Sequence, residues 1–303
     1  MWVRDESMSI KRFFDKHMGF FLMSPTIAVM VLIIIVPLII GLVMSFFNYN
    51  LLTLHRGIPF IGLSNYSRAL GDENFWMAFL NTLWWTAANV AGQVALGLLI
   101  ALLVNQPVKG VGIYKALILI PWAVPSAVAA LSWMWLLHPE FGLVNDIAVR
   151  LGLVGEPVAW LGRPFTAQVW VVIARVWKEF PLSALIFHAA LQTIPKDLYE
   201  AAEVDGAGTW KRFWSITIPY LRASIVVAIT LITIWTFNSF NMIWVMTKGG
   251  PRGATEILAT SIYKIAFQRY NFGFASSQSI LMVIFLSVII IFYLYKVEGK
   301  RID

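Results

Sequence analysis

The sequence has no cysteine and few charged residues, and each scarcity excludes a class of protein. Without cysteine, the 303-residue chain forms no disulfide, binds no metal through thiolates and has no cysteine nucleophile. Charged residues make up 13% of the chain, against about 25% in soluble domains. The histidines are scattered and lack metal-ligand spacing; they are His17, His55, His138 and His188. We therefore expect no metal site and no catalytic site. The low share of charged residues indicates that water is not the main solvent of this chain.

Apolar residues are correspondingly abundant. Hydrophobic residues make up 59% of the chain and aromatic residues 15%. A helix that crosses a membrane needs roughly 20 mainly apolar residues. Six stretches are long enough, at residues 20–47, 77–104, 111–137, 165–192, 216–246 and 275–295. The sequence therefore predicts an all-α polytopic membrane protein with six transmembrane helices in the lipid bilayer.

The basic residues predict the orientation of these spans. One side of the membrane receives 13 of the 23 Lys and Arg residues, the other side receives 8, and Arg175 and Lys178 lie inside the fourth span. Because cytoplasmic loops carry the excess of positive charge, both termini are expected in the cytoplasm. Four residues of the predicted outer side run against this bias: Lys248, Arg252, Lys264 and Arg269. The predicted organisation is a cytoplasmic segment 1–19, a six-helix domain 20–295 and a cytoplasmic tail 296–303.

The net charge of +7 raises nucleic acid as a partner, but no basic run interleaves with surface aromatics. Positive charge on loops beside the membrane accounts for the balance, so no nucleic-acid partner is expected. The sequence also has no G-x-x-x-x-G-K-[ST] motif, so we expect nucleotide binding to reside in another polypeptide.

A polar segment separates the fourth and fifth spans, at about residues 193–215. Pro195 suits the first turn of a helix. Three acids place negative charge near the positive N-terminal end of that helix; they are Asp197, Glu200 and Glu203. Gly206 and Gly208 then break the helix, and a second piece presents Trp210, Phe213 and Trp214 on one side. From the residues alone, the segment is either an interfacial helix on lipid headgroups or a helix that docks on a protein.

The spacing within this segment resembles a known signature. Glu200-Ala201-Ala202 is followed by three residues, Gly206, nine residues and Ile216-Thr217-Ile218-Pro219. The pattern resembles the EAA signature of permease subunits of binding-protein-dependent ABC importers. That signature has Leu where this chain has Ile218, a volume-conserving apolar change.

Other phrases, over about residues 20–295, are similar to the sugar-importing branch of that family. They are Ile120-Pro121-Trp122-Ala123-Val124-Pro125, the Trp133-to-Asn145 stretch with Phe141-Gly142-Leu143, Leu191-Gln192-Thr193-Ile194-Pro195, and Gly249-Gly250-Pro251. The C-terminus lacks the GAVKG-like tail of the second permease in such pairs, and the 138–164 loop is short. The chain therefore resembles the first permease of a heterodimer, maltose-F-like or glycerol-phosphate-permease-like.

The resemblance implies a function and a set of partners. It implies a subunit of an ATP-driven importer in a bacterial or archaeal inner membrane, which translocates a sugar or sugar-like solute delivered by an extracytoplasmic solute-binding protein. It also implies a second permease subunit and an ATP-binding cassette ATPase dimer, which binds ATP and Mg, so that this chain has no cofactor. The 193–215 loop would be the coupling helix that contacts the ATPase, through Glu200, Ala201, Ala202, Asp205 and Gly206.

Three charged residues lie near the middle of the fourth span: Arg175, Lys178 and Glu179. Charges in a membrane interior are costly and usually face a cavity or a partner. Arg175 and Glu179 have the i,i+4 spacing of an ion pair on one helix face. This pair either stabilises a kink at Pro181 or belongs to a polar path in which Lys178 meets an oxygen-rich or anionic substrate.

Aromatic and amide side chains extend the predicted path. Sugars offer flat C–H faces and hydroxyl groups, so aromatic platforms and amides suit them. Asn238 and Asn241 are spaced i,i+3 and are predicted to share a helix face with Trp235 in the fifth span. Asn89 is the corresponding amide in the second span. Ordinary packing is the competing interpretation for each of these side chains.

Two other classes remain open at this stage. An ion-coupled secondary transporter would show inverted repeats and intramembrane acids, whereas Glu179 is the only deep acid here. A polytopic membrane enzyme would need paired carboxylates, a histidine cluster or an activated nucleophile at a membrane surface. No such arrangement emerges apart from the acids of the 197–205 loop. Within the importer class, the sequence does not identify which sugar is carried.

Overall fold

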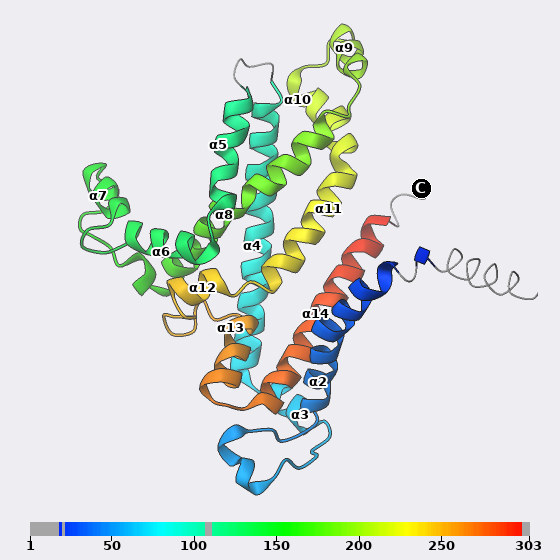
Figure 1. The fold of residues 1–303 in the computed structure, drawn as a ribbon. Helices are drawn as coiled ribbons and strands as arrows, with labels where there is room; N and C mark the ends of the chain where they lie inside the picture. Colours follow the sequence, from blue (N-terminus) through cyan, green and yellow to red (C-terminus); the bar gives the residue numbers. More distant parts are fainter. Residues whose placement is uncertain (1–17, 20–21, 107–110, 299–303) are drawn as a thin grey trace, which may run out of the picture. The chain divides into compact units, whose positions relative to one another are not determined.

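The structure is a computed structural model that describes residues 18–19, 22–106 and 111–298. These residues form helices joined by turns and loops, and their only β contacts are two isolated bridges (Figure 1). The predicted all-α class is confirmed. The predicted cytoplasmic segment 1–19 and tail 296–303 fall mostly outside the described residues.

The chain divides into two compact units, which are residues 1–69 with 265–280, and residues 70–264 with 281–303. The first unit contains the helical run Leu22–Met44, which is apolar along its length and has none of its most apolar stretch buried. This run confirms a long apolar helix within the predicted stretch 20–47. Its bounded pieces and the short helices that follow are η1 (Val31–Ile35), α2 (Val36–Met44), η2 (Leu51–Arg56) and α3 (Ser64–Leu70).

Close backbone approach holds the loops of the first unit together. The Asn65 side-chain amide donates to the carbonyls of Ser45 at 2.9 Å and Phe47 at 3.0 Å. The Gly273 N–H donates to the Tyr49 carbonyl at 3.0 Å. A Cβ on Gly273 would lie 2.2 Å from the Phe47 carbonyl oxygen, so only glycine fits there.

The core of the second unit is a bundle of three long helices, α4 (Glu73–Val104), α8 (Pro164–Leu191) and α11 (Ile218–Phe237). Two glycines let α4 and α8 approach closely. A Cβ on Gly92 would lie 2.7 Å from Val176 Cγ2, and one on Gly97 would lie 2.6 Å from Ser183 Cβ. Small residues at a helix contact are the usual means of close packing in membranes, where no hydrophobic force draws helices together.

The predicted third span, 111–137, is not one straight helix. It consists of α5 (Val111–Ala123) and α6 (Ser126–Leu136), which meet at an angle of 91°. Pro125 supplies the reason, because the residue before a proline is pushed out of the helical region. The chain continues through two short helices before α8, namely α7 (Leu143–Arg150) and η3 (Trp160–Gly162).

The predicted fifth span, 216–246, is also corrected at both ends. The helix begins earlier, since α10 (Thr209–Arg212), η4 (Phe213–Thr217) and α11 form one run, Thr209–Phe237. It then breaks at Asn238. The chain resumes in α12 (Asn241–Met246), and the remaining helices are α13 (Leu258–Tyr263), η5 (Lys264–Gln268) and α14 (Phe272–Glu298).

Four helices in the described residues are long and apolar enough to cross a membrane, and the bent α5–α6 pair would make a fifth span. The long helix α8 is not among these candidates. Every 18-residue stretch of α8 contains Arg175, Lys178 and Glu179, because these lie at its centre. A crossing by α8 therefore requires a polar interior for its charged face.

Candidate functional site

The polar segment after α8 folds as a helix, a turn and a second helix. The first helix, α9 (Lys196–Val204), begins directly after Pro195. Its end is a Schellman motif, in which the Gly206 N–H donates to the Glu203 carbonyl at 3.0 Å and the Ala207 N–H donates to the Ala202 carbonyl at 2.8 Å. Gly206 has φ +74°, a conformation that glycine adopts without strain. The predicted helix and glycine bend are therefore present.

The residues of the EAA-like pattern lie on the outside of the described chain. Glu200, Ala201, Asp205 and Gly206 are exposed, and Ala202 is half-buried. No cation of the described residues lies within 4 Å of the carboxylates of Glu200 or Asp205. The opposite face of α9 instead packs inward, since its partly buried side chains join an apolar cluster; they are Leu198 and Tyr199. The segment is anchored on one side and open on the other.

A surface ion pair and a cluster of aromatic rings lie beside this open face. Arg212 Nη1 in α10 lies 2.8 Å from Glu203 Oε2 in α9. Beyond the turn, the rings of Trp210, Phe213 and Trp214 contact one another, with centroids 5.2–5.8 Å apart. The aromatic cluster predicted for this segment is therefore formed. In Figure 1, α9 projects past the ends of the long helices at the top of the view.

In α8, Arg175 and Lys178 are buried and Glu179 is half-buried, but their pairing differs from the prediction. Glu179 lies 3.1 Å from Lys178 Nζ and not within ion-pair distance of Arg175. Arg175 donates instead to Ser239 Oγ at 2.8 Å and to the Trp235 carbonyl at 3.5 Å. The predicted i,i+4 pair is therefore wrong, because Arg175 extends across to the end of α11 while Lys178 folds back onto its neighbour.

A cavity of about 200 Å³ lies between α4, α5, α8 and α11. Three predicted path residues line it, Arg175, Glu179 and Trp235. Sequence reasoning missed two buried polar residues that also line it, Gln93 and Thr236. Their Nε2 and Oγ1 atoms, with Arg175 Nε, have no hydrogen-bond partner among the described residues. A lone Gln in an apolar helix was the signal that could have found Gln93.

The predicted amides lie in three different settings. Asn89 is fully buried in α4 and donates to the Trp85 carbonyl at 2.8 Å. Asn238 follows the last residue of α11 and donates to the Ile234 carbonyl at 2.8 Å. Asn241 begins α12. The prediction that Asn238, Asn241 and Trp235 share one helix face is therefore wrong, because the helix ends between them, although all three are exposed in this chain.

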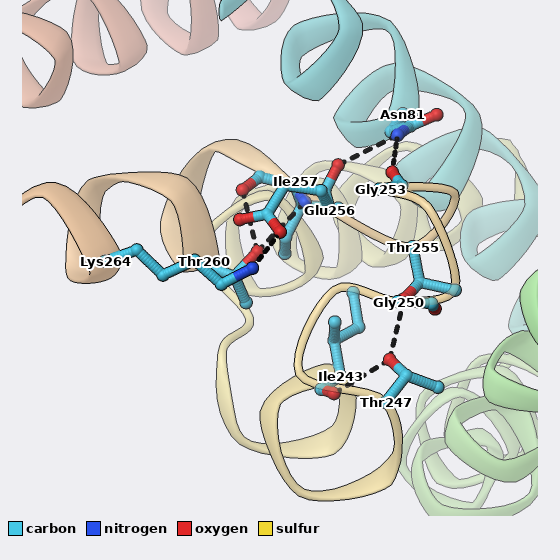
Figure 2. A network of polar contacts seen from close by, with 10 residues as sticks. All are labelled: Asn81, Ile243, Thr247, Gly250, Gly253, Thr255, Glu256, Ile257, Thr260 and Lys264. Atoms are coloured by element: carbon cyan, nitrogen blue, oxygen red, sulfur yellow. Dashed lines mark hydrogen bonds and ion pairs between the residues drawn. The ribbon is translucent and has the colours of Figure 1, made fainter. Parts of the chain in front are cut away.

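A polar network missed by sequence reasoning fastens the loop between α12 and α13 (Figure 2). The Asn81 amide in α4 donates to the carbonyls of Gly253 at 3.0 Å and Glu256 at 2.9 Å. Thr255 Oγ1 donates to the Gly250 carbonyl at 2.7 Å. The Glu256 carboxylate, 12% exposed, is paired with Lys264 Nζ. Side-chain hydrogen bonds and an ion pair therefore hold this loop in a defined conformation.

Long apolar helices, a cavity among them that includes polar side chains, and an anchored helix–turn–helix with an open face are typical of a membrane transport subunit. In the described residues no three potential metal-ligating side chains lie together. Residues 93–302, more than half of the chain, match the family described as the inner membrane component of binding-protein-dependent transport systems. The chain belongs to this family. It is a permease subunit of an ABC importer, a non-enzymatic membrane component whose ATPase is a separate partner.

Individual relatives match over nearly the whole length. The trehalose/maltose transport system permease protein MalF of Thermococcus litoralis is 39% identical over 99% of this chain and 100% of the relative. The sulfoquinovosyl glycerol transport system permease protein SmoG of Agrobacterium fabrum is 36% identical over 94% of this chain and 92% of the relative.

A solved structure shares the fold. A chain of a bacterial ABC transporter involved in the import of the acidic polysaccharide alginate superposes with a TM-score of 0.82 at 22% identity, over 96% of this chain and 99% of that chain. Family membership decides among the three classes left open by the residues, in favour of the importer.

Proposed function

We propose that this permease carries a carbohydrate or carbohydrate-like solute that an extracytoplasmic binding protein delivers. The support comes from relatives that are permeases of trehalose/maltose, sulfoquinovosyl glycerol and lactose transport systems. A structure of the related alginate importer includes a periplasmic protein bound to an alginate pentasaccharide. Solutes of this kind expose many hydroxyl groups, and the cavity of this chain offers donors and acceptors for them.

The proposed topology has six spans and both termini in the cytoplasm, with a membrane domain at 20–295 between segments 1–19 and 296–303. Four apolar helices and the bent α5–α6 pair account for five spans. We assign the sixth to α8, whose 28 residues are long enough. The pair between the buried Lys178 and the half-buried Glu179 supports this assignment, since charges within a membrane are tolerated when they are paired and face the bundle.

The proposed substrate path runs along the cavity between α4, α8 and α11. Arg175, Glu179 and Trp235 line the cavity in this chain. Lys178, whose ammonium group is paired with the Glu179 carboxylate, is the third charged residue of the proposed path. The exposed amides Asn238 and Asn241 extend the path, and a second permease subunit would cover their side. Asn89 is buried in α4 outside the cavity lining, so its place on the path stays a prediction.

The proposed coupling site is the open face of α9 and its turn, formed by Glu200, Ala201, Ala202, Asp205 and Gly206. The single observation behind the proposal is that this EAA-like segment is anchored on one face, while Glu200 and Asp205 are exposed and have no ion-pair partner among the described residues. Unpaired carboxylates beside small residues suit basic groups on a partner. The partner would be an ATP-binding cassette ATPase dimer, which would bind ATP and Mg.

The test is reconstitution of both permeases and the ATPase in liposomes, with the binding protein and radiolabelled trehalose, maltose or lactose. We expect uptake that requires ATP on the cytoplasmic side and binding protein on the other. Glu200→Arg should lower ATPase copurification and uptake together, whereas Glu203→Gln, which removes an acid already paired to Arg212, should lower both much less. Wild-type uptake with Glu200→Arg would contradict the coupling site.

The path has its own test. Asn238→Ala and Asn241→Ala should assemble with the ATPase normally and lose uptake, since they remove path amides without touching α9. Unchanged kinetics of uptake in both variants would remove these two residues from the path and leave the coupling site unaffected.

A further inference from the structure

The outer loop, residues 247–256 between α12 and α13, contains a turn with an unusual residue at its centre. The Ala254 N–H donates to the Pro251 carbonyl at 2.9 Å, and the two central residues, Arg252 and Gly253, have φ +53° and +77°. Two positive φ values define a turn in which Asn or Gly is strongly preferred at the first central position. This chain has an arginine there.

A second cation occupies a comparable position at the start of the loop. Lys248 follows the end of α12 with φ +51°, and its N–H donates to the carbonyls of Ile243 at 3.0 Å and Trp244 at 3.2 Å. This is the left-handed residue of a helix end, where glycine is the usual choice. A residue with a Cβ is sterically strained in this conformation.

Side chains from α4 and α8 tie the outer loop close to these two positions. Asn81 ties the carbonyls of Gly253 and Glu256, and Gln168 Nε2 donates to the Ala254 carbonyl at 2.7 Å. Figure 2 shows Asn81 reaching the loop from α4 and Thr255 closing it onto Gly250. Backbone strain that the surroundings hold in place is a reason to look for function at that residue.

The two cations are exposed and unpaired in the described chain. Lys248 and Arg252 are exposed, and no described carboxylate lies within 4 Å of either. Lys264, by contrast, neutralises the buried Glu256 and so has a structural reason to be basic. In the proposed topology this loop is extracytoplasmic, where basic residues oppose the usual charge bias of membrane insertion.

We propose that the outer loop is a rigid docking element, which presents Lys248 and Arg252 to an acidic surface of the extracytoplasmic binding protein. The inference rests on the proposed topology and partner. The loop has cations at two positions where glycine or asparagine would fold with less strain, so backbone conformation alone does not explain these residues. Charge pairs across such an interface steer association and fix its register.

The test uses substitutions that remove charge and relieve strain together. Lys248→Asn, Arg252→Asn and the double variant are compared with wild type in nanodiscs that contain the full transporter, and binding-protein affinity is measured at low and high salt. We expect about tenfold weaker binding for the double variant at low salt and a smaller salt dependence. Lys248→Arg with Arg252→Lys should bind as wild type does.

A matched control removes one charge outside the loop. Arg269 is exposed on the same predicted side, and Arg269→Asn should leave the affinity within about twofold. Thermal unfolding should show the two Asn variants at least as stable as wild type, so that a loss of binding is not a loss of folding. Equal affinities of the double variant and wild type would overturn the proposal, as would lost association with the second permease at unchanged binding-protein affinity.

Cysteine labelling tests the proposed membrane topology and the docking of the binding protein separately. Because the chain has no cysteine, Arg252→Cys creates a unique site for a membrane-impermeant maleimide. Labelling from outside, blocked by added binding protein, supports the docking element. Labelling only from the cytoplasmic side would overturn the proposed topology, whereas outside labelling that binding protein does not block would overturn the docking element alone.

Discussion

Two helix ends in this protein adopt the same left-handed conformation with different residues. The helix α9 ends at Gly206, with φ +74°, and α12 ends at Lys248, with φ +51°. Glycine satisfies the backbone at no steric cost, whereas lysine adopts the same conformation under strain. The first end is specified by backbone geometry alone. At the second, backbone geometry does not explain the lysine.

The segments that follow the two helix ends also differ in how firmly side-chain contacts hold them. Beyond Gly206 one surface ion pair, Glu203 with Arg212, joins the two helices, and the remaining acids face outward. Beyond Lys248 the loop is tied by side-chain hydrogen bonds from α4 and α8, and its only acid, Glu256, is buried against Lys264. A loosely tied segment can adapt to a partner, whereas a firmly tied loop presents a fixed surface.

The largest effect is expected from breaking the buried pair of the outer loop. Glu256→Gln leaves the Lys264 ammonium without its counter-charge, which should lower the free energy of unfolding by about 2–3 kcal/mol, a value reduced from that of fully buried pairs because Lys264 is 28% exposed. Thermal unfolding of the purified transporter measures the loss. Glu256→Gln with Lys264→Met should recover part of it in a double-mutant cycle, and additive losses would show that the two side chains do not interact.

A β-branched residue in place of Gly206 tests whether the end of α9 requires the left-handed conformation. Gly206→Val must place a Cβ in the left-handed region, at a cost of about 1–2 kcal/mol, which lowers the population of the turn roughly 5- to 30-fold. ATPase copurification and uptake should fall together. Gly206→Asn is the control, because asparagine tolerates this conformation and should keep most of both activities; equal activity of the Val and Asn variants would contradict the account.

The reciprocal change at the end of α12 should stabilise the protein. Lys248→Gly relieves the left-handed strain, and we expect a gain of up to about 1 kcal/mol in the free energy of unfolding, reduced by the greater entropy of glycine in the unfolded chain. The midpoint of thermal unfolding measures it. A substantial loss of stability would mean that the Lys248 side chain makes contacts that hold the loop.

The smallest effect is expected at the surface pair near α9. The carboxylate of Glu203 is 72% exposed, so replacing Arg212 by Gln should change the free energy of unfolding by no more than about 0.5–1 kcal/mol. High salt should abolish even this difference. A larger loss would place the α9–α10 segment among the firmly tied parts of the molecule, and the comparison between the two ends would fail.

Particular residues show what could be predicted from sequence. The helix–turn–helix around Gly206 was predictable because proline, acids and glycine act within a few residues of one another. The Arg175–Glu179 pair was predicted wrongly because each side chain had a competing partner, Ser239 or Lys178, and spacing along one helix does not rank them. Asn238 and Asn241 were placed on one helix that in fact ends between them.

The sequence by itself determined the class of protein, since a chain with 59% hydrophobic and 13% charged residues must bury its backbone in helices within a membrane. It also determined the family, through a spacing confined to one segment. Only the tertiary structure decided that Gln93, Arg175 and Thr236 share a cavity and that Asn81 fastens the outer loop. These contacts join residues far apart in the chain, and their geometry depends on helix packing and helix breaks that local sequence patterns do not encode.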